Sequence, residues 1–258
     1  MRFSANLGFL WKELPLPEAI RAAGAVGFDA VECHWPYETP AAEVVKALDQ
    51  TGLRMLSQNT GRGDSSRGEN GLSALPGREG EARVLIDQAI EYATAIGAAN
   101  IHVMAGNANG PTANATFVDN LRYAAAMARV HDITILIEPL NRYDAPGYFL
   151  KTTSHAIRII EEVGASNLKL MFDCYHVQIM EGDLSRRLSA LLPLIGHIQI
   201  ASVPDRHEPG SGEIDYGYLL KFLDRVGWAG WVGCEYMPLA TTDDGLVWIE
   251  NLRRKLGG

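Results

Sequence analysis

The stretch Ile133-Thr-Ile-Leu-Ile-Glu138-Pro-Leu is a β-branched, apolar run that ends in a single carboxylate. Three later runs repeat the pattern: Leu168-Lys-Leu-Met-Phe-Asp173, His197-Ile-Gln199-Ile-Ala and Trp231-Val-Gly-Cys-Glu235-Tyr. Short apolar runs of this kind are typical of parallel strands that are buried on both faces. A carboxylate is costly there unless it is paired or holds a cation. The four runs therefore predict parallel strands with polar groups gathered at their carboxyl ends.

Strand-like runs alternate with amphipathic helical segments along the whole chain. The eight strands are expected to begin near Phe3, Ala30, Met55, Asn100, Thr134, Leu168, His197 and Trp231. Eight strand–helix units of this kind predict an α/β fold, a closed (β/α)8 TIM barrel that forms one domain over residues 1–258. The alternative is an open, doubly wound sheet. That fold normally has a glycine-rich phosphate turn after its first strand, and Asn6-Leu-Gly-Phe-Leu-Trp lacks one.

Glycines follow the predicted helices and indicate left-handed helix ends, at Gly27, Gly52, Gly97, Gly164 and Gly227. The segment 57–80 differs from the rest because it contains six glycines, and it is expected to form a long loop after the third strand. Long loops on this face are often lids. A passive insertion is an equally good interpretation of this segment.

The bulk composition narrows the class of protein. The 258 residues are 47% hydrophobic and carry a net charge of −8, and this charge argues against a nucleic-acid partner. No apolar run approaches the ~20 residues of a membrane span, and the N-terminus lacks the apolar core of a signal peptide. The three cysteines have no paired spacing, as expected of free thiols in a reducing compartment. We therefore expect a cytoplasmic protein.

The polar strand ends predict a metal site. Glu138, Asp173, Gln199 and Glu235 end the fifth to eighth strands, which form an arc at the carboxyl end of the predicted barrel. Side-chain alternation puts Gln199 on the face of His197, and Glu235 on the face of Gly233. Because every donor is an oxygen, the predicted ion is Mg²⁺ or Mn²⁺ rather than Zn²⁺. A buried ion pair with a Lys or Arg is the alternative for each single carboxylate.

Other polar residues near the strand ends allow more than one interpretation. His176 stands three residues after Asp173, and we expect it to hydrogen-bond the substrate. Arg206 lies in the loop after the seventh strand, where it could pair with a substrate carboxylate or remain solvated. Glu32 either supports the site from behind or forms an ion pair at the rim. His197 is expected to be a satisfied histidine of the barrel core.

Several motifs resemble those of a known superfamily. The strings Ile137-Glu-Pro-Leu-Asn141, Phe172-Asp-Cys-Tyr-His176, Gly196-His-Ile-Gln-Ile-Ala201, Arg206-His-Glu-Pro-Gly-Ser-Gly-Glu-Ile-Asp-Tyr216 and Gly233-Cys-Glu-Tyr236 resemble the sugar isomerase/epimerase TIM-barrel superfamily. Arg2-Phe-Ser-Ala-Asn6, Leu75-Pro-Gly-Arg-Glu79 and Asn120-Leu-Arg-Tyr-Ala124 make the chain similar to the hydroxypyruvate isomerase family. The motifs occur in the same order over nearly the whole chain.

The resemblance implies roles for individual residues. Glu138, Asp173, Gln199 and Glu235 would bind the metal, Glu138 and Glu235 would also transfer protons, and His176 and Arg206 would contact substrate. Many epimerases of the superfamily have histidine where this chain has Gln199, which points to the hydroxypyruvate isomerase branch. The family's tendency to form oligomers implies a homo-oligomer.

The expected reaction is the interconversion of hydroxypyruvate and 2-hydroxy-3-oxopropanoate (tartronate semialdehyde) through an enediolate. The metal would polarise the carbonyl, and the two glutamates would remove and return a proton. The alternatives within the superfamily are a 2-oxo-tetronate isomerase, a ketose 3-epimerase and, more distantly, a nuclease acting at abasic sites. A metal-containing sugar-acid binding protein is the alternative without catalysis.

Overall fold

A closed ring of eight parallel strands forms the centre of the molecule. The computed structural model describes residues 1–256, with side chains as far as Leu252. The strands run in the order β2-β1-β8-β7-β6-β5-β4-β3, and a parallel bridge joins Val31 of β2 to Met55, two residues before β3. Their bounds are β1 (Arg2–Asn6), β2 (Ala30–Glu32), β3 (Ser57–Asn59), β4 (Asn100–His102), β5 (Thr134–Ile137), β6 (Leu168–Asp173), β7 (Ile195–Ile200) and β8 (Trp231–Cys234). The predicted (β/α)8 barrel is confirmed.

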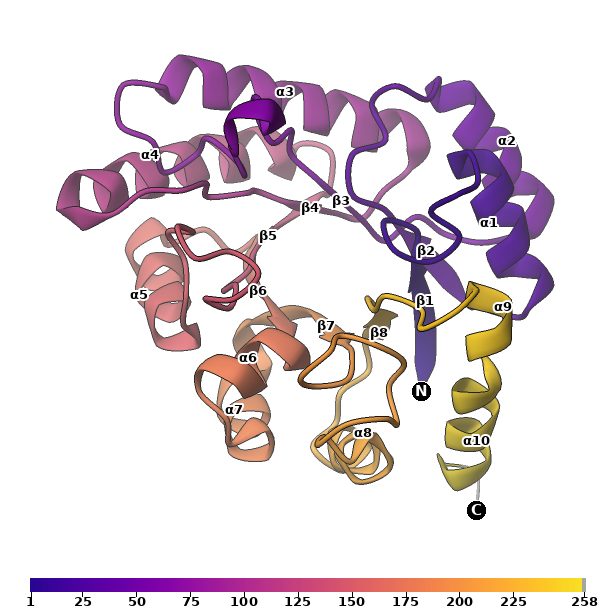
Figure 1. Ribbon diagram of the computed structural model, residues 1–258. Coiled ribbons are helices and arrows are strands. Elements are labelled where there is room, and N and C mark those ends of the chain that lie inside the picture. Colours follow the sequence, from indigo (N-terminus) through magenta and orange to yellow (C-terminus); the bar gives the residue numbers. More distant parts are fainter. Residues whose placement is uncertain (257–258) are drawn as a thin grey trace.

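The helices surround this ring, as Figure 1 shows. Their apolar faces pack on the outer side of the strands, so that one continuous core lies between the two layers. The α-helices are α1 (Leu16–Ala25), α2 (Ala41–Thr51), α3 (Glu79–Ile96), α4 (Gly110–Arg129), α5 (Thr153–Val163), α6 (Cys174–Met180), α7 (Leu184–Leu191), α8 (Tyr216–Arg225), α9 (Thr242–Gly245) and α10 (Val247–Leu256), and the 3₁₀ turns are η1 (Ser65–Arg67) and η2 (Leu192–Leu194). None of the helices described is long and apolar enough to cross a membrane.

Glycine ends the helices where the sequence predicts it. Gly52, Gly97 and Gly164 are the left-handed C-caps of α2, α3 and α5. Gly27 and Gly227 also have positive φ, one residue beyond the caps of α1 and α8. A residue with a Cβ is strained in this conformation, so glycine is the residue that turns each chain segment back toward the next strand.

The strand register brings the polar strand ends to one level of the barrel. Asp173 of β6 pairs with Gln199 of β7, and Gln199 pairs with Gly233 of β8. On the other side of β8, Asn6 of β1 pairs with Glu32 of β2. These positions lie at the carboxyl ends of their strands, the end at which barrels of this type hold their functional residues.

The long segment after β3 is anchored at one end. Its residues Leu72, Ser73 and Ala74 are buried, while residues 63–68 are exposed. Gly71 (φ +102°) passes so close to the β4–α4 connection that an added Cβ would lie 2.4 Å from the carbonyl oxygen of Met104. If this segment acts as a lid, the part that moves is the exposed stretch 63–68 around η1. That role remains a prediction.

Helix α10 completes the outer layer beside β1 and β8. The ring of Trp248 packs edge-on against Phe3, with 6.4 Å between ring centroids, and against Tyr236, with 5.8 Å. Its indole nitrogen also donates a hydrogen bond of 3.0 Å to the hydroxyl of Tyr236. These contacts hold α10 against β1, which ends at Asn6, and against the end of β8, which Glu235 follows.

Candidate active site

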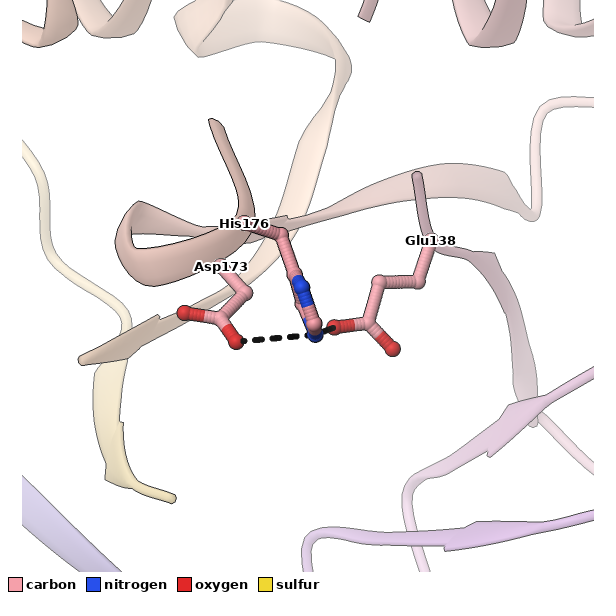
Figure 2. Close-up of side chains that lie close together, drawn as sticks. All are labelled: Glu138, Asp173 and His176. Carbon is pink, nitrogen blue, oxygen red and sulfur yellow. Dashed lines mark ion pairs between the residues drawn. The ribbon is translucent and has the colours of Figure 1, made fainter. Parts of the chain in front are cut away.

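Two carboxylates and an imidazole meet at the carboxyl ends of β5 and β6. Glu138 directly follows β5, Asp173 ends β6, and His176 lies in the first turn of α6. Each offers a donor atom, and these atoms lie within 4.8 Å of one another, a spacing that could hold a metal ion. Figure 2 shows the imidazole between the two carboxylates, with Nε2 3.6 Å from Oδ2 of Asp173 and 3.9 Å from Oε1 of Glu138. All three side chains are buried.

The sharp turn from β6 into α6 explains this arrangement. Asp173 is the N-cap of the helix, and its Oδ1 accepts a hydrogen bond of 2.9 Å from the backbone N–H of Tyr175. A capping carboxylate and the residue three positions later lie on the same side of the first helical turn. His176 is therefore held beside Asp173, and Oδ2 of the capping residue stays free for other partners.

Three buried oxygens at this end of the barrel have no hydrogen-bond partner in the described part of the chain. They are Oε1 of Glu138, Oδ2 of Asp173 and Oε1 of Gln199. Buried acceptors are almost always satisfied, so an unsatisfied group of them indicates a ligand. Oxygen donors of this kind suit a hard divalent cation such as Mg²⁺ or Mn²⁺. The donor set therefore fits the predicted divalent metal.

A hydrogen-bonded layer beneath these oxygens sets the direction of the Gln199 amide. Its Nε2 donates 2.8 Å to Oε2 of Glu32. The same carboxylate accepts 2.6 Å from the hydroxyl of Ser4 and lies 3.1 Å from Nε2 of His197. A carboxylate only accepts hydrogen bonds, so the amide nitrogen faces Glu32 and Oε1 faces away from it. His197 is the satisfied core histidine that the sequence predicts, and Glu32 is a support behind the site rather than a rim residue.

Glu235, which follows β8, differs from Glu138 and Asp173 because both of its oxygens have hydrogen-bond partners. Oε1 accepts 2.9 Å from Nδ2 of Asn6 and lies 3.0 Å from Nε2 of His34. Oε2 accepts 2.6 Å from the guanidinium of Arg206. The last of the four predicted metal ligands is thus held as an ionised carboxylate by protein donors.

Arg206 lies between the acidic residues and two aromatic rings. Besides its bond to Glu235, its NH2 group is 3.6 Å from Oδ2 of Asp173. The guanidinium lies over the rings of Phe9 and Tyr175, 4.8 and 4.9 Å from their centroids. Its buried Nε has no partner among the described residues. Arg206 is therefore fixed in place by its neighbours and largely shielded from solvent, unlike a solvated loop residue. Its Nε–H group remains available as a hydrogen-bond donor.

The surroundings move the pKa values of the acidic residues in opposite directions. Burial, and then the charges of Glu235 and Asp173, raise the pKa of Glu138 well above its usual range. Burial also raises the pKa of Asp173 to about 7, against the opposing effect of Arg206. For Glu235 burial acts in the same direction, but Arg206 and then His34 outweigh it and lower the pKa to about 2. The protein without a cation therefore holds Glu235 ionised and favours a proton on Glu138.

The structure brings all six of the predicted site residues to one end of the barrel. Glu138, Asp173 and His176 form one group, Arg206 joins Asp173 to Glu235, and Gln199 presents its oxygen from β7. Four further residues contact this set without having been predicted from the sequence: Asn6, His34, Asn141 and Asp144. His34 follows Glu32 by two positions, and this spacing was a signal that could have found it.

Comparison with known proteins supports the resemblance seen in the motifs. A model of the xylose isomerase-like TIM barrel family matches residues 20–252. The 2-oxo-tetronate isomerase of Cupriavidus necator is 48% identical, with 96% of this chain and 97% of that protein covered. The hydroxypyruvate isomerase of Escherichia coli is 42% identical, with 98% and 100% covered.

Solved structures agree on the fold. A crystal structure of AP endonuclease, family 2, from Brucella melitensis superposes with a TM-score of 0.94 at 42% identity, covering 97% of this chain and 98% of that one. A D-psicose 3-epimerase crystallised in the presence of D-fructose has a TM-score of 0.78 at 20% identity, covering 100% and 97%, and shows the fold alone. With a family model matched over most of its length and relatives above 40% identity along nearly all of it, this chain belongs to the xylose isomerase-like TIM barrel family.

Proposed function

We propose that this protein is an aldose–ketose isomerase that acts on a small hydroxy-oxo acid. The leading substrate pair is hydroxypyruvate and 2-hydroxy-3-oxopropanoate, and the four-carbon 2-oxo-tetronate is the alternative. The observation that carries the proposal is the placement of Glu138 and Glu235. The two glutamates directly follow β5 and β8, the outer strands of the arc, at the end of the barrel where the unsatisfied buried oxygens lie. Two carboxylates at one cation site suit the removal of a proton from a bound hydroxy-oxo acid and its return.

A divalent cation, Mg²⁺ or Mn²⁺, completes this proposal. Its ligands would be Glu138, Asp173, Gln199 and Glu235, three of which have an unsatisfied buried oxygen. When bound, such an ion would polarise a substrate carbonyl and stabilise negative charge on its oxygen. Three carboxylates around one +2 ion would leave one negative charge, which the charge of Arg206 would offset through its ion pairs with Asp173 and Glu235.

Two of the proposed cation ligands would also transfer protons. Glu138 and Glu235 would remove a proton from the carbon beside the carbonyl and return it to the neighbouring carbon. Asn6 and His34 hold the carboxylate of Glu235 in one orientation from the β1 and β2 side of the barrel. Because these hydrogen bonds already hold the carboxylate in position, it needs little reorientation during proton transfer.

Arg206 would recognise the acid group of the substrate. Its guanidinium lies over the rings of Phe9 and Tyr175, and its Nε keeps a free donor. A charged N–H donor binds a carboxylate more strongly than a neutral hydroxyl, so it selects an acid over a neutral sugar. This feature favours a hydroxy-oxo acid over the ketoses that a 3-epimerase converts.

Nuclease activity is the competing function that a relative's name suggests. A site for abasic DNA would need a histidine-rich zinc centre and a basic groove. The metal-binding group described here has one histidine and two carboxylates, and the chain has a net charge of −8. DNA with an abasic site is therefore a suitable negative control.

The test is an NMR assay in D₂O with Mg²⁺, using hydroxypyruvate and 2-oxo-tetronate in separate samples. We expect isomerisation of at least one acid with incorporation of deuterium, and loss of turnover when EDTA is added. Mn²⁺ is tested by the same assay after the metal has been removed. Absence of conversion for both acids with both metals would overturn the substrate assignment. Cleavage of abasic DNA would support the competing function instead.

A further inference from the structure

The imidazole of His176 accepts hydrogen bonds at Nδ1. The backbone N–H of Asn141 points at this atom from 3.1 Å, and Nδ2 of the same asparagine lies 2.8 Å from it. A backbone N–H is always a donor, so Nδ1 has to be the acceptor. An acceptor nitrogen carries no proton, which excludes both the Nδ1–H tautomer and the doubly protonated imidazolium.

The side chain of Asn141 cannot turn round to reverse this arrangement. Its Oδ1 accepts hydrogen bonds from the backbone N–H groups of Tyr143 at 2.9 Å and Asp144 at 3.0 Å. Its Nδ2 also donates 3.1 Å to the carboxylate of Asp144. A flipped amide would place an N–H group against two backbone donors. The turn after β5 therefore fixes the amide so that it too donates to Nδ1 of His176.

A neutral imidazole with a bare Nδ1 carries its proton on Nε2. That atom points into the space between the carboxylates, 3.6 Å from Oδ2 of Asp173 and 3.9 Å from Oε1 of Glu138 (Figure 2). Neither distance is a direct hydrogen bond. A nitrogen that bears a proton has no lone pair to offer a metal ion. His176 is thus close to the proposed cation ligands, but in this tautomer it cannot be one of them.

We propose that Asn141 is a positioning residue that holds His176 as the neutral Nε2–H tautomer, so that His176 donates a hydrogen bond to a substrate oxygen and does not bind the cation. The substrate half of this inference rests on the proposed isomerase function. The oxygen concerned belongs to the carbonyl–hydroxyl pair of a hydroxy-oxo acid, where negative charge grows as the neighbouring C–H proton leaves. A donor that already points at that position stabilises the charge without reorganising.

The tautomer can be measured directly by ¹⁵N NMR on protein with ¹⁵N-labelled histidine. The chain has seven histidines, and a His176→Gln variant identifies the signals of His176. We expect an unprotonated Nδ1 and a protonated Nε2 at neutral pH, both before and after the addition of Mg²⁺. A proton on Nδ1, or the loss of the Nε2 proton on addition of Mg²⁺, would overturn the inference. The result does not depend on turnover, so failure of the proposed function would be seen separately.

Asn141→Asp tests the positioning role without removing the turn. The aspartate keeps an oxygen for the N–H groups of Tyr143 and Asp144, but it presents an acceptor to His176 in place of the Nδ2 donor. The carboxylate favours a proton on Nδ1, against the backbone N–H of residue 141 that still points at this atom. We therefore expect the share of the Nε2–H tautomer to fall in this variant, together with a fall in kcat of at least tenfold and a smaller change in KM. An unchanged tautomer with unchanged kcat would remove Asn141 from the mechanism.

The chain offers a matched control on its surface. Oδ1 of Asn114 lies 3.3 Å from Nε2 of His155, outside the group formed by Glu138, Asp173 and His176. Asn114→Asp makes the same substitution beside a different histidine, but it keeps the acceptor oxygen that faces this histidine. It should alter only the signals of His155 and leave kcat at the level of the unmodified protein.

Discussion

Gly233 faces the carboxylate of Glu32 so closely that a Cβ at position 233 would lie 2.3 Å from Oε1 of Glu32. It would also lie 2.8 Å from Nε2 of His197 and 3.0 Å from Cγ of Gln199. The glycine in β8 thus leaves room for the polar layer that directs the Gln199 amide. The position of the Gln199 oxygen that faces the proposed cation therefore depends on the packing of this layer inside the barrel.

Gly233→Ala should therefore weaken both folding and cation binding. We expect overpacking to lower the free energy of unfolding by about 1–3 kcal/mol, and the affinity for Mn²⁺ to fall because Gln199 is displaced. Gly80→Ala is the control, since Gly80 is the second residue of α3 and an added Cβ there meets no atom within 4 Å. Thermal unfolding and a Mn²⁺ titration check both effects. Normal Mn²⁺ affinity in Gly233→Ala would show that the layer does not direct Gln199.

Glu235→Gln separates an enzyme from a binding protein. The variant keeps the shape of the side chain but loses its charge, so it can no longer exchange a proton with the substrate. We expect kcat to fall about 100-fold or more, while binding of the substrate changes much less. Equilibrium binding and deuterium exchange from substrate give the two readouts.

The control for that experiment is Glu91→Gln on the exposed face of α3. It should leave both quantities unchanged. A protein that binds the acid but never exchanges its proton, with or without Glu235, would be the sugar-acid binding protein instead.

Arg206→Lys tests recognition of the acid group. Lysine keeps the charge but loses the planar group that lies over Phe9 and Tyr175 and can bind a carboxylate with two donors. We expect KM for hydroxypyruvate to rise about tenfold, which corresponds to one lost charge-assisted hydrogen bond. Arg122→Lys, at an exposed ion pair with Asp119, is the control. Equal effects on an acid and on a neutral ketose would contradict the role in acid recognition.

Cation binding should depend on pH because it competes with protons. Burial raises the pKa of Asp173 to about 7 in the protein without a cation, and it also raises the pKa of Glu138. Both carboxyls have to lose their protons before they bind a metal. The apparent affinity for Mn²⁺ should therefore rise as the pH increases from 6 to 8. Calorimetry in two buffers with different ionisation enthalpies would detect the released protons, and an affinity independent of pH would contradict the prediction.

The sequence predicts the barrel and the arc of polar strand ends because both follow from local rules. Alternation of side chains gives the inner face of each strand, and the carboxyl ends of parallel strands lie at one side of the sheet. These rules were enough for Glu138, Asp173, Gln199 and Glu235. They give the end of the barrel at which a residue lies, and they do not give its hydrogen-bond partners.

The missed residues depend on closure of the barrel and on the shape of its loops. Asn6 and His34 reach Glu235 from more than 200 positions away in the chain. Such a contact is set by strand tilt and by the loop after each strand, and a residue pattern encodes neither. Asn141 reaches His176 because a turn after β5 bends back to the start of α6. Arg206 could be placed in a loop from the sequence, but its aromatic neighbours come from the β1–α1 loop, for Phe9, and from α6, for Tyr175.

Glu138→Gln should stabilise the protein when the metal has been removed. Because the pKa of Glu138 is raised in the folded state, the native protein binds a proton more tightly than the unfolded chain, and this carboxylate costs stability once the pH exceeds its ordinary pKa. The gain from an uncharged amide should be larger at pH 8 than at pH 5, on the order of 1 kcal/mol. Chemical unfolding with EDTA at the two pH values measures it, with Glu91→Gln as the control. Saturating Mn²⁺ should reverse the order, since the unmodified protein then gains the binding free energy that the variant has lost. A variant less stable than the unmodified protein under all these conditions would mean that Glu138 serves packing rather than a cation.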